Sequence, residues 1–262
     1  MTNTVLLCPP IFFDVTYSIN PWMQGDKVDK AIAMDQWFKL KYGIEAWGVE
    51  VKLIGQEPRL PDMVFTANAG TVRGNKVVLS NFKHPERQLE TDVYERWFKA
   101  AGYETHRLPR KINFEGCGDT VIMGDKMFAG YGWRSDLGGI RRAAKILGLE
   151  LIPLKLNHPN FYHLDTCFCL LGQQSAMYYP GAFSPSAIKK LKKHIPELIP
   201  LDVHDATMFA CNSVVHDGRI LMPAGAQKIV EELDIRGYEV TQINTSEFLK
   251  SGGSLQCMTL WI

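Results

Sequence analysis

The sequence has no long hydrophobic run, no excess of charge of one sign and few cysteines. Its first ten residues, MTNTVLLCPP, carry neither the basic start of a secretion signal nor an apolar stretch long enough to span a membrane. The net charge is +1 and the pI is near 7.6, which gives no electrostatic basis for binding nucleic acid or an acidic membrane. These features favour a cytoplasmic protein with no nucleic acid and no membrane among its partners.

The six cysteines are too few and too irregularly spaced for a disulfide framework in a chain of 262 residues. Cys167 and Cys169 form a C-x-C pair in a strand-like run, but no second ligand pair accompanies them, which argues against zinc. We therefore expect free thiols, no metal site and no cofactor. The remaining question is why a cysteine, Cys257, follows the flexible segment SGGS so close to the C-terminus.

Four segments of the chain resemble one another and read as β-hairpins. They begin at Val64, Phe114, Tyr162 and Phe209, with spacings of 50, 48 and 47 residues (64 to 114, 114 to 162, 162 to 209). Glycine-containing turns separate alternating apolar runs at 73–75, 124–125, 172 and 217–218, which is the composition expected of hairpins. The sequence therefore contains an internal repeat of about 50 residues.

Each hairpin is followed by a helical pattern and a further short strand, as in SPSAIKKLKKHI before LIPLDV. The N-terminal stretches VLLCPPIFF, DKAIAMDQWFKLKYG and VEVKLI supply most of a fifth unit, whose missing strand would come from SLQCMTLWI at the C-terminus. Such closure removes an exposed sheet edge. The sequence predicts an α/β fold with a single domain over 1–262, a five-bladed propeller of ββαβ repeats with pseudo-fivefold symmetry, closed by the N- and C-terminal strands.

Polar residues recur on the first strand of each predicted hairpin, where a core is expected. Equivalent positions of a ring converge on its axis, and buried carboxylates without partners cost several kcal/mol, so such a cluster calls for a cationic ligand or mutual neutralisation. Each residue alone also has a structural explanation: a satisfied core histidine, a turn-forming acid, or a buried cysteine. The positions are Asp62, Thr66, Asn68, Glu115, Asp119, His163, Asp165, Asn212 and Cys257.

Seven segments resemble the guanidino-modifying enzymes, the pentein superfamily, and they occur in family order along the whole chain. They are NPWM, PDMVFTANAG, HPERQ, FEGCGD, GYGWRS, FYHLDTCF and GGSLQC. The superfamily includes arginine deiminase, amidinotransferases and dimethylarginine dimethylaminohydrolase, and its fold is the five-bladed α/β propeller. The sequences of these segments are most similar to the arginine dihydrolase branch, which also occurs as the N-terminal domain of cyanobacterial arginine-degrading fusions.

The resemblance implies a role for each matching residue. Cys257 matches the nucleophile, His163 the general acid/base and Glu115 the carboxylate paired with the histidine. Asp165 matches a guanidinium-binding acid, and Asp119, in the same matching segment as Glu115, is expected to bind the substrate as well. Substrate binding is further implied for Arg87 and Arg134, which match holders of the α-carboxylate, and for Asn20 and Asn68, which match asparagines of the dihydrolase branch.

The implied chemistry is covalent: a thiolate attacks the guanidinium carbon, ammonia leaves, and water releases the thiouronium intermediate. The partner is then a small molecule, arginine or a substituted arginine, and a homo-oligomer is compatible with the sequence. Asn68 replaces the aspartate of deiminases and methylarginine hydrolases, which leaves citrulline or ornithine as product. Open alternatives are a dimethylarginine hydrolase, an amidinotransferase and, without catalysis, a ribosome anti-association factor of the same fold.

Overall fold

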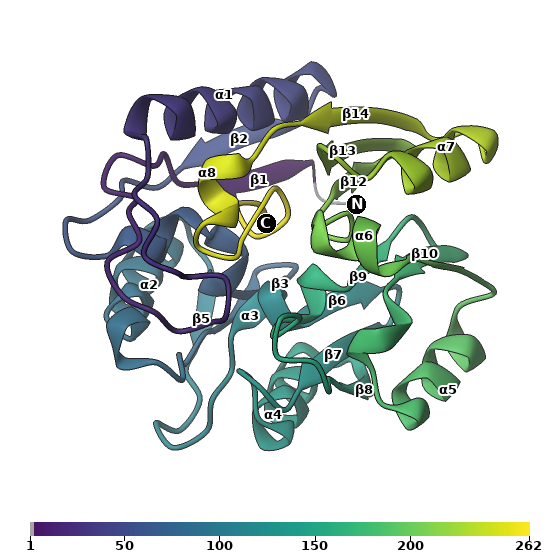
Figure 1. Ribbon diagram of the computed structural model, residues 1–262. Helices are drawn as coiled ribbons and strands as arrows, with labels where there is room; N and C mark the ends of the chain where they lie inside the picture. Colours follow the sequence, from purple (N-terminus) through teal and green to yellow (C-terminus); the bar gives the residue numbers. More distant parts are fainter. Residues whose placement is uncertain (1–2) are drawn as a thin grey trace.

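The computed structural model describes residues 3–262, which form five three-stranded sheets arranged around a common centre (Figure 1). In every sheet the middle strand pairs antiparallel with an inner strand and parallel with an outer one. In inner–middle–outer order the sheets are β15 (Leu260–Trp261), β1 (Thr4–Leu7), β2 (Glu50–Leu53); β3 (Gly70–Arg73), β4 (Lys76–Leu79), β5 (Glu104–His106); β6 (Thr120–Met123), β7 (Lys126–Tyr131), β8 (Glu150–Lys155); β9 (Phe168–Leu170), β10 (Ser175–Tyr178), β11 (Glu197–Pro200); β12 (Val214–His216), β13 (Arg219–Pro223), β14 (Glu239–Ile243). The predicted five-bladed arrangement is confirmed.

One long helix joins the middle and outer strands of each unit and lies on the outside of the ring (Figure 1). Two of these helices begin with a residue whose side chain accepts hydrogen bonds from the first turn. Asp29 accepts from two backbone N–H groups, and Ser184, which directly precedes a proline, accepts from the N–H of Ala187. A third ends at Gly148, whose φ of 65° is the left-handed cap that glycine adopts without strain. The five helices are α1 (Lys30–Ala46), α2 (Glu90–Ala100), α4 (Leu137–Leu147), α5 (Pro185–His194) and α7 (Gln227–Ile235).

The C-terminal strand β15 completes the first sheet by pairing with β1. Val5 lies opposite Trp261 and Leu6 opposite Leu260, so the inner strand of this unit comes from the far end of the chain. The C-terminal end, labelled in Figure 1, lies toward the middle of the ring. The pairing places Cys257, three residues before β15, at the centre of the molecule.

From the sequence we expected the polar residues on the inner strands, and this expectation is wrong. Most of them lie in or directly before single helical turns that precede those strands: η2 (Thr66–Ala69), α3 (Gly116–Asp119) and η4 (Leu164–Thr166). Asn212 and Cys257 lie in loops before β12 and β15. The reason is steric, because five chain segments converge at this end of the ring and a tight turn brings several side chains to one point. The remaining short helices are η1 (Pro61–Val64), η3 (Pro85–Arg87), η5 (Pro180–Ala182), α6 (Val203–Thr207) and α8 (Ser246–Leu249).

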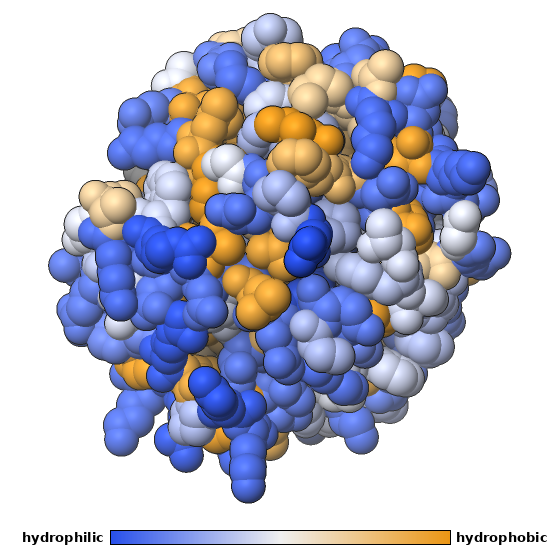
Figure 2. Space-filling model, turned by 90° about the vertical axis from the view of Figure 1, so that its left-hand side faces the viewer, coloured by the Kyte–Doolittle hydropathy of each residue, from blue (hydrophilic) through white to orange (hydrophobic). Residues whose placement is uncertain are grey.

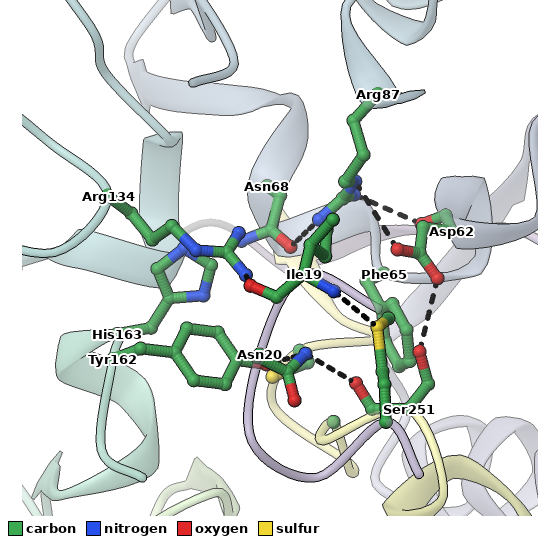
Figure 3. Close-up of a pocket in the computed structure, with 13 residues that line it drawn as sticks. Ile19, Asn20, Asp62, Phe65, Asn68, Arg87, Arg134, Tyr162, His163 and Ser251 are labelled. Atoms are coloured by element: carbon green, nitrogen blue, oxygen red, sulfur yellow. Dashed lines mark hydrogen bonds and ion pairs between the residues drawn. The ribbon is translucent and has the colours of Figure 1, made fainter. Parts of the chain in front are cut away.

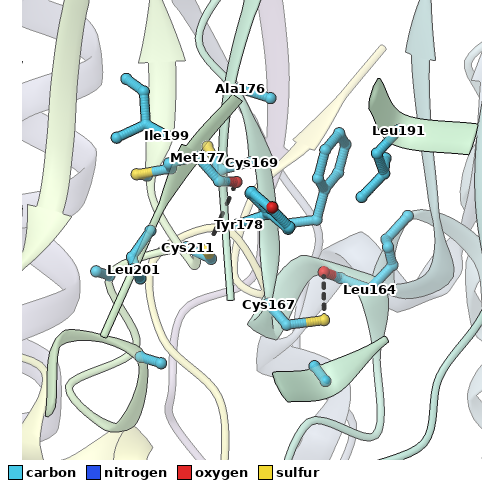
Figure 4. Close-up of a cluster of buried hydrophobic side chains, with 14 of the residues drawn as sticks. Leu164, Cys167, Cys169, Ala176, Met177, Tyr178, Leu191, Ile199, Leu201 and Cys211 are labelled. Atoms are coloured by element: carbon cyan, nitrogen blue, oxygen red, sulfur yellow. Dashed lines mark hydrogen bonds between the residues drawn. The ribbon is translucent and has the colours of Figure 1, made fainter. Parts of the chain in front are cut away.

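Three cysteines that compete with Cys257 for a chemical role lie in the apolar core beside β9–β11 (Figure 4). The Cys167 thiol donates to Leu164 O at 3.5 Å, and the Cys211 thiol to Met177 O at 3.8 Å. Burial raises the pKa of Cys169 to about 12. Cys167 and Cys211 thus donate to backbone carbonyls within the core, as packing cysteines do.

The surface mixes apolar and charged side chains. Figure 2, which shows the left-hand side of Figure 1, has orange apolar groups set among blue polar ones. The largest exposed apolar side chains include Tyr42, Leu89 and Ile235. Among the helices described here, none combines the length and the apolar character needed to cross a membrane.

Candidate active site

The one-turn helices η1, η2 and η3, the loop residues Arg134, Tyr162 and His163, and the chain segments 19–23 and 251–257 enclose a small cavity at one end of the ring (Figure 3). Its free volume is about 10 Å³, which is room for roughly one water molecule. Segment 19–23 closes it through two contacts: Arg134 Nη2 donates to Ile19 O at 3.0 Å, and Asn20 Nδ2 donates to Ser251 O at 3.0 Å. A ligand the size of an amino acid therefore requires this segment to move.

Cys257 lies against an amide and a carboxyl group. Its backbone N–H donates to Asn212 Oδ1 at 3.1 Å, while Asn212 Nδ2 donates to the sulfur at 3.0 Å. The thiol donates to Asp165 Oδ2 at 3.1 Å. Burial and the neighbouring Asp165 charge raise the pKa of Cys257. The thiol is therefore neutral at rest, and a cation entering the site would favour its ionisation.

His163 is held by a buried carboxylate. Its Nε2 lies 2.8 Å from Glu115 Oε2, and Arg134 Nη1 donates to the same oxygen at 3.0 Å. Burial raises the pKa of Glu115, but Arg134 and His163 outweigh it, so the pKa falls below its ordinary range. Burial lowers the pKa of His163 to about 4 against the opposing effect of Glu115. The imidazole is thus neutral at physiological pH and available as a base.

Asn68 is oriented by Arg87 (Figure 3). Arg87 Nη1 donates to Asn68 Oδ1 at 2.9 Å, and the same guanidinium binds Glu90 through Nε and Nη2, both at 2.8 Å. Because Oδ1 is occupied, Nδ2 points the other way, toward His163 and Gly118. This Nδ2 is buried and has no hydrogen-bond partner within residues 3–262. It is a donor ready for a ligand acceptor.

Two predicted carboxylates differ in exposure to ligands. Asp165 Oδ1 is buried and without a partner in the described part of the chain, and burial raises the pKa of Asp165 to about 7. Asp119 instead accepts two backbone N–H groups, from Ser135 at 3.1 Å and from Leu164 at 3.2 Å. Within the described residues, Asn20, Asn68, Arg87, Arg134, His163 and Cys257 line the cavity, whereas Asp119, Glu115 and Asp165 do not. Asp165 reaches the site through its contact with the Cys257 thiol.

Sequence reasoning missed several lining residues. Tyr162 stacks under Arg134, with the guanidinium carbon 4.5 Å from the ring centre, and donates to Gly252 O at 2.7 Å. Ser251 donates to Asp62 Oδ1 at 3.2 Å. Asn212 was noted as a polar residue, but its hydrogen bonds to Cys257 were not foreseen. The position of Tyr162 beside His163 was the one available signal, since neighbours of a site residue often share its loop.

The pentein class that the sequence resembles is confirmed by comparison with known families. The model of the N,N dimethylarginine dimethylhydrolase family, eukaryotic type, matches residues 16–262. The chain belongs to this family.

Two curated relatives carry names that state different activities. It is 41% identical over 262 residues to the bifunctional arginine dihydrolase/ornithine cyclodeaminase ArgZ of Synechocystis, covering 98% of this chain and 37% of that protein. It is 38% identical over 262 residues to N(G),N(G)-dimethylarginine dimethylaminohydrolase of Mycobacterium tuberculosis, covering 100% of this chain and 86% of that protein. The chain thus spans under two fifths of the bifunctional relative.

Solved structures of the N-terminal domain of ArgZ match the whole fold. One, with a cysteine replaced by serine and bound to its substrate, has a TM-score of 0.95 at 40% identity, covering 98% of this chain and 97% of that domain. Another, with an asparagine replaced by serine, is covalently bound to a reaction intermediate and also has a TM-score of 0.95.

Proposed function

We propose that this chain hydrolyses the guanidinium group of arginine twice, giving ornithine, two ammonia molecules and carbon dioxide. The observation that carries the proposal is the Asn68 amide, whose oxygen is held by Arg87 at 2.9 Å and whose Nδ2 is left unpartnered among residues 3–262. A donor at this position suits the oxygen of a ureido group, whereas a carboxylate would repel it. The similarity to the arginine dihydrolase ArgZ supports the same reading.

In the first hydrolysis, Asp165 binds guanidinium N–H groups and Cys257 attacks the central carbon. The positive ligand favours both the ionised carboxylate and the thiolate, which burial otherwise disfavours. The proton that the thiol gives up ends on the departing nitrogen, delivered by His163, and ammonia leaves as the thiouronium forms. Water, deprotonated by His163, then adds to the carbon, and the C–S bond breaks to give citrulline and the free thiol.

The second hydrolysis repeats these steps on the ureido carbon. Asn68 Nδ2 donates to the ureido oxygen and stabilises the negative charge that develops there when Cys257 attacks. A second ammonia leaves, which gives an S-carbamoyl intermediate; water adds to its carbon and the C–S bond breaks. The carbamic acid so formed loses carbon dioxide as its C–N bond breaks and the nitrogen takes the acid proton, leaving ornithine as the organic product. The sum is arginine plus two waters giving ornithine, two ammonia and one carbon dioxide.

The other predicted residues hold the substrate or the site. We assign Arg134 and Asn20 to the remote end of the substrate, since both join the cavity wall to segment 19–23. Arg87 orients Asn68, and Glu115 orients His163. Asp119 holds the backbone at Leu164 instead of touching substrate. We treat 1–262 as one catalytic domain.

A second candidate is hydrolysis of dimethylarginine, which is favoured by the matching family model and by the Mycobacterium tuberculosis relative. The two candidates differ in the leaving group, dimethylamine or ammonia. Incubation with arginine, citrulline, agmatine and dimethylarginine, followed by chromatography of the products, separates them. We expect ornithine from arginine and from citrulline. Dimethylamine release as the fastest reaction would place the second candidate first.

A further inference from the structure

A second, much larger cavity lies along the centre of the ring behind Cys257. Its volume is about 680 Å³, and all five inner strands contribute to its wall. Four of the inner strands run from the active-site end to a hairpin turn. The cavity is lined at both ends of these strands, by Asp165 beside Cys257 and by turn residues at the opposite face. Exposed turn residues form its mouth there, among them Gly74, Gly124, Gln173, Asp217 and Gly218.

Asp165 connects this cavity with the nucleophile. The residue lines the second cavity, and its Oδ2 accepts the Cys257 thiol at 3.1 Å. Its Oδ1 is buried and has no hydrogen-bond partner in the described part of the chain, although a buried carboxyl oxygen normally has one. A small polar molecule at the inner end of this cavity could donate a hydrogen bond to that oxygen. Asp165 alone would then lie between this molecule and the reacting sulfur of Cys257.

The cavity that takes the substrate is a poor route for ammonia to leave and for water to enter during the reaction. It has about 10 Å³ of free space and is closed by segment 19–23. Between two hydrolyses, one ammonia must leave and water must enter while the ureido intermediate stays bound. Opening segment 19–23 for this exchange would release the intermediate into solution.

We propose that the second cavity is a passage for water and ammonia between the Cys257–Asp165 pair and the face of the ring opposite the substrate. This inference rests on the proposed double hydrolysis. Both molecules are small, neutral and able to donate to Asp165 Oδ1, and the passage walls are mainly apolar side chains that retain neither. The separate exit lets the carbon skeleton stay in the closed site until ornithine has formed.

Narrowing the passage at its walls tests this proposal. Val121 and Val215 are half-buried, line the second cavity and lie on β6 and β12, away from the substrate cavity. We expect the Val121→Trp/Val215→Trp double variant to lower kcat for arginine by about five-fold or more with KM not raised. The reason is that ammonia release and water entry follow substrate binding and then limit turnover. The fraction of citrulline that escapes should rise.

Val240→Trp is the matched control, since Val240 is a half-buried valine on β14 that lines neither cavity. Equal kcat and citrulline release in the double variant and the control would overturn the passage. A raised KM with unchanged kcat would also overturn it, because the cavity would then be the substrate entrance. If tryptophan prevents folding, as seen by circular dichroism, phenylalanine at the same two positions gives the same comparison. One ammonia per arginine from the unmodified protein rejects the double hydrolysis separately, while the kcat comparison still tests the passage.

Discussion

The Arg87 guanidinium donates to Asn68 Oδ1 at 2.9 Å, and this contact decides which end of the Asn68 amide faces His163. Arg87 is itself fixed by two hydrogen bonds to Glu90, and both charged groups are buried. An amide whose oxygen is held in this way presents its N–H₂ group to the ligand. The direction of one buried amide thus separates a site suited to a neutral ureido group from one suited only to a cation.

The space beside Asn68 is equally constrained. A Cβ added at Gly118 would lie 2.2 Å from Asn68 Nδ2 and 3.2 Å from His163 Nδ1. We expect Gly118→Ala to displace the amide and reduce kcat for citrulline by about a hundred-fold, since small displacements of positioned groups cost that much. Gly138→Ala is the matched control, because its nearest neighbour would be 4.0 Å away. Equal citrulline kinetics in both variants would contradict the assigned role of Asn68.

Arg87 should contribute to stability as well as to orientation. Arg87→Ala leaves the buried carboxylate of Glu90 unpaired, so we expect the free energy of unfolding to fall by about 3–5 kcal/mol. Arg107 makes a comparable pair with Glu95 and Asp92, but it is 47% exposed, and Arg107→Ala should cost only about 0–1 kcal/mol. Urea unfolding of the two variants measures both values. Similar losses would show that Arg87 is not the buried anchor described here.

Cys257→Ser should abolish turnover and leave the fold intact, because the serine hydroxyl stays protonated where the thiol can ionise. Arginine should still bind, as measured by calorimetry. Cys8→Ala is the control: Cys8 is buried in a different core cluster, so its loss should cost about 1 kcal/mol of stability and no activity. Retention of a tenth of the activity by Cys257→Ser would end the covalent mechanism.

The pH dependence of kcat/KM should report Asp165. Burial raises its pKa to about 7, and only the ionised form binds a guanidinium ion, so kcat/KM for arginine should rise with pH through about 7. Burial also raises the pKa of Glu90 to about 7, so the Asp165→Asn variant is needed to identify the group. In that variant kcat/KM should be low, and it should increase with pH between pH ~5 and ~9 much less than it does in the unmodified protein. An unchanged rise would assign it to another group.

The same raised pKa has a consequence for stability. The folded protein holds the Asp165 proton more tightly than the unfolded chain, so this group stabilises the fold at low pH and ceases to do so as pH rises through about 7. Asp165→Asn should therefore raise the melting temperature more at alkaline pH than at acid pH. Scanning calorimetry at both pH values checks the sign, and an equal shift at both would contradict it.

The ring could be predicted from the sequence because each unit repeats the same signals of glycine turn, amphipathic helix and short strand. The turns at Gly74, Gly124 and Asp217–Gly218 are two-residue hairpins with positive φ at these residues, as their sequences indicate. The fourth hairpin has a longer connection, with Leu170 opposite Ala176. Its sequence LGQQS has one glycine and no residue pair typical of a tight turn.

Apart from the pairing of Glu115 with His163, which the family resemblance implied, the contacts within the site could not be predicted from the sequence. Asn212 and Cys257 are 45 residues apart, and their mutual hydrogen bonds depend on how two units meet at the axis. The contact of Arg87 with Asn68 likewise follows from the packing of η3 against η2, for which no local pattern exists. Residue types and spacing indicated which side chains converge, whereas their partners required the structure.

The ratio of ammonia released to arginine consumed, measured at complete conversion, tests the central claim most directly. We predict a ratio near two for the unmodified protein, because each arginine is hydrolysed twice. For Asn68→Asp we predict a ratio near one, because the added carboxylate should still accept cationic arginine but repel the ureido oxygen. A ratio near one for the unmodified protein would contradict the double hydrolysis.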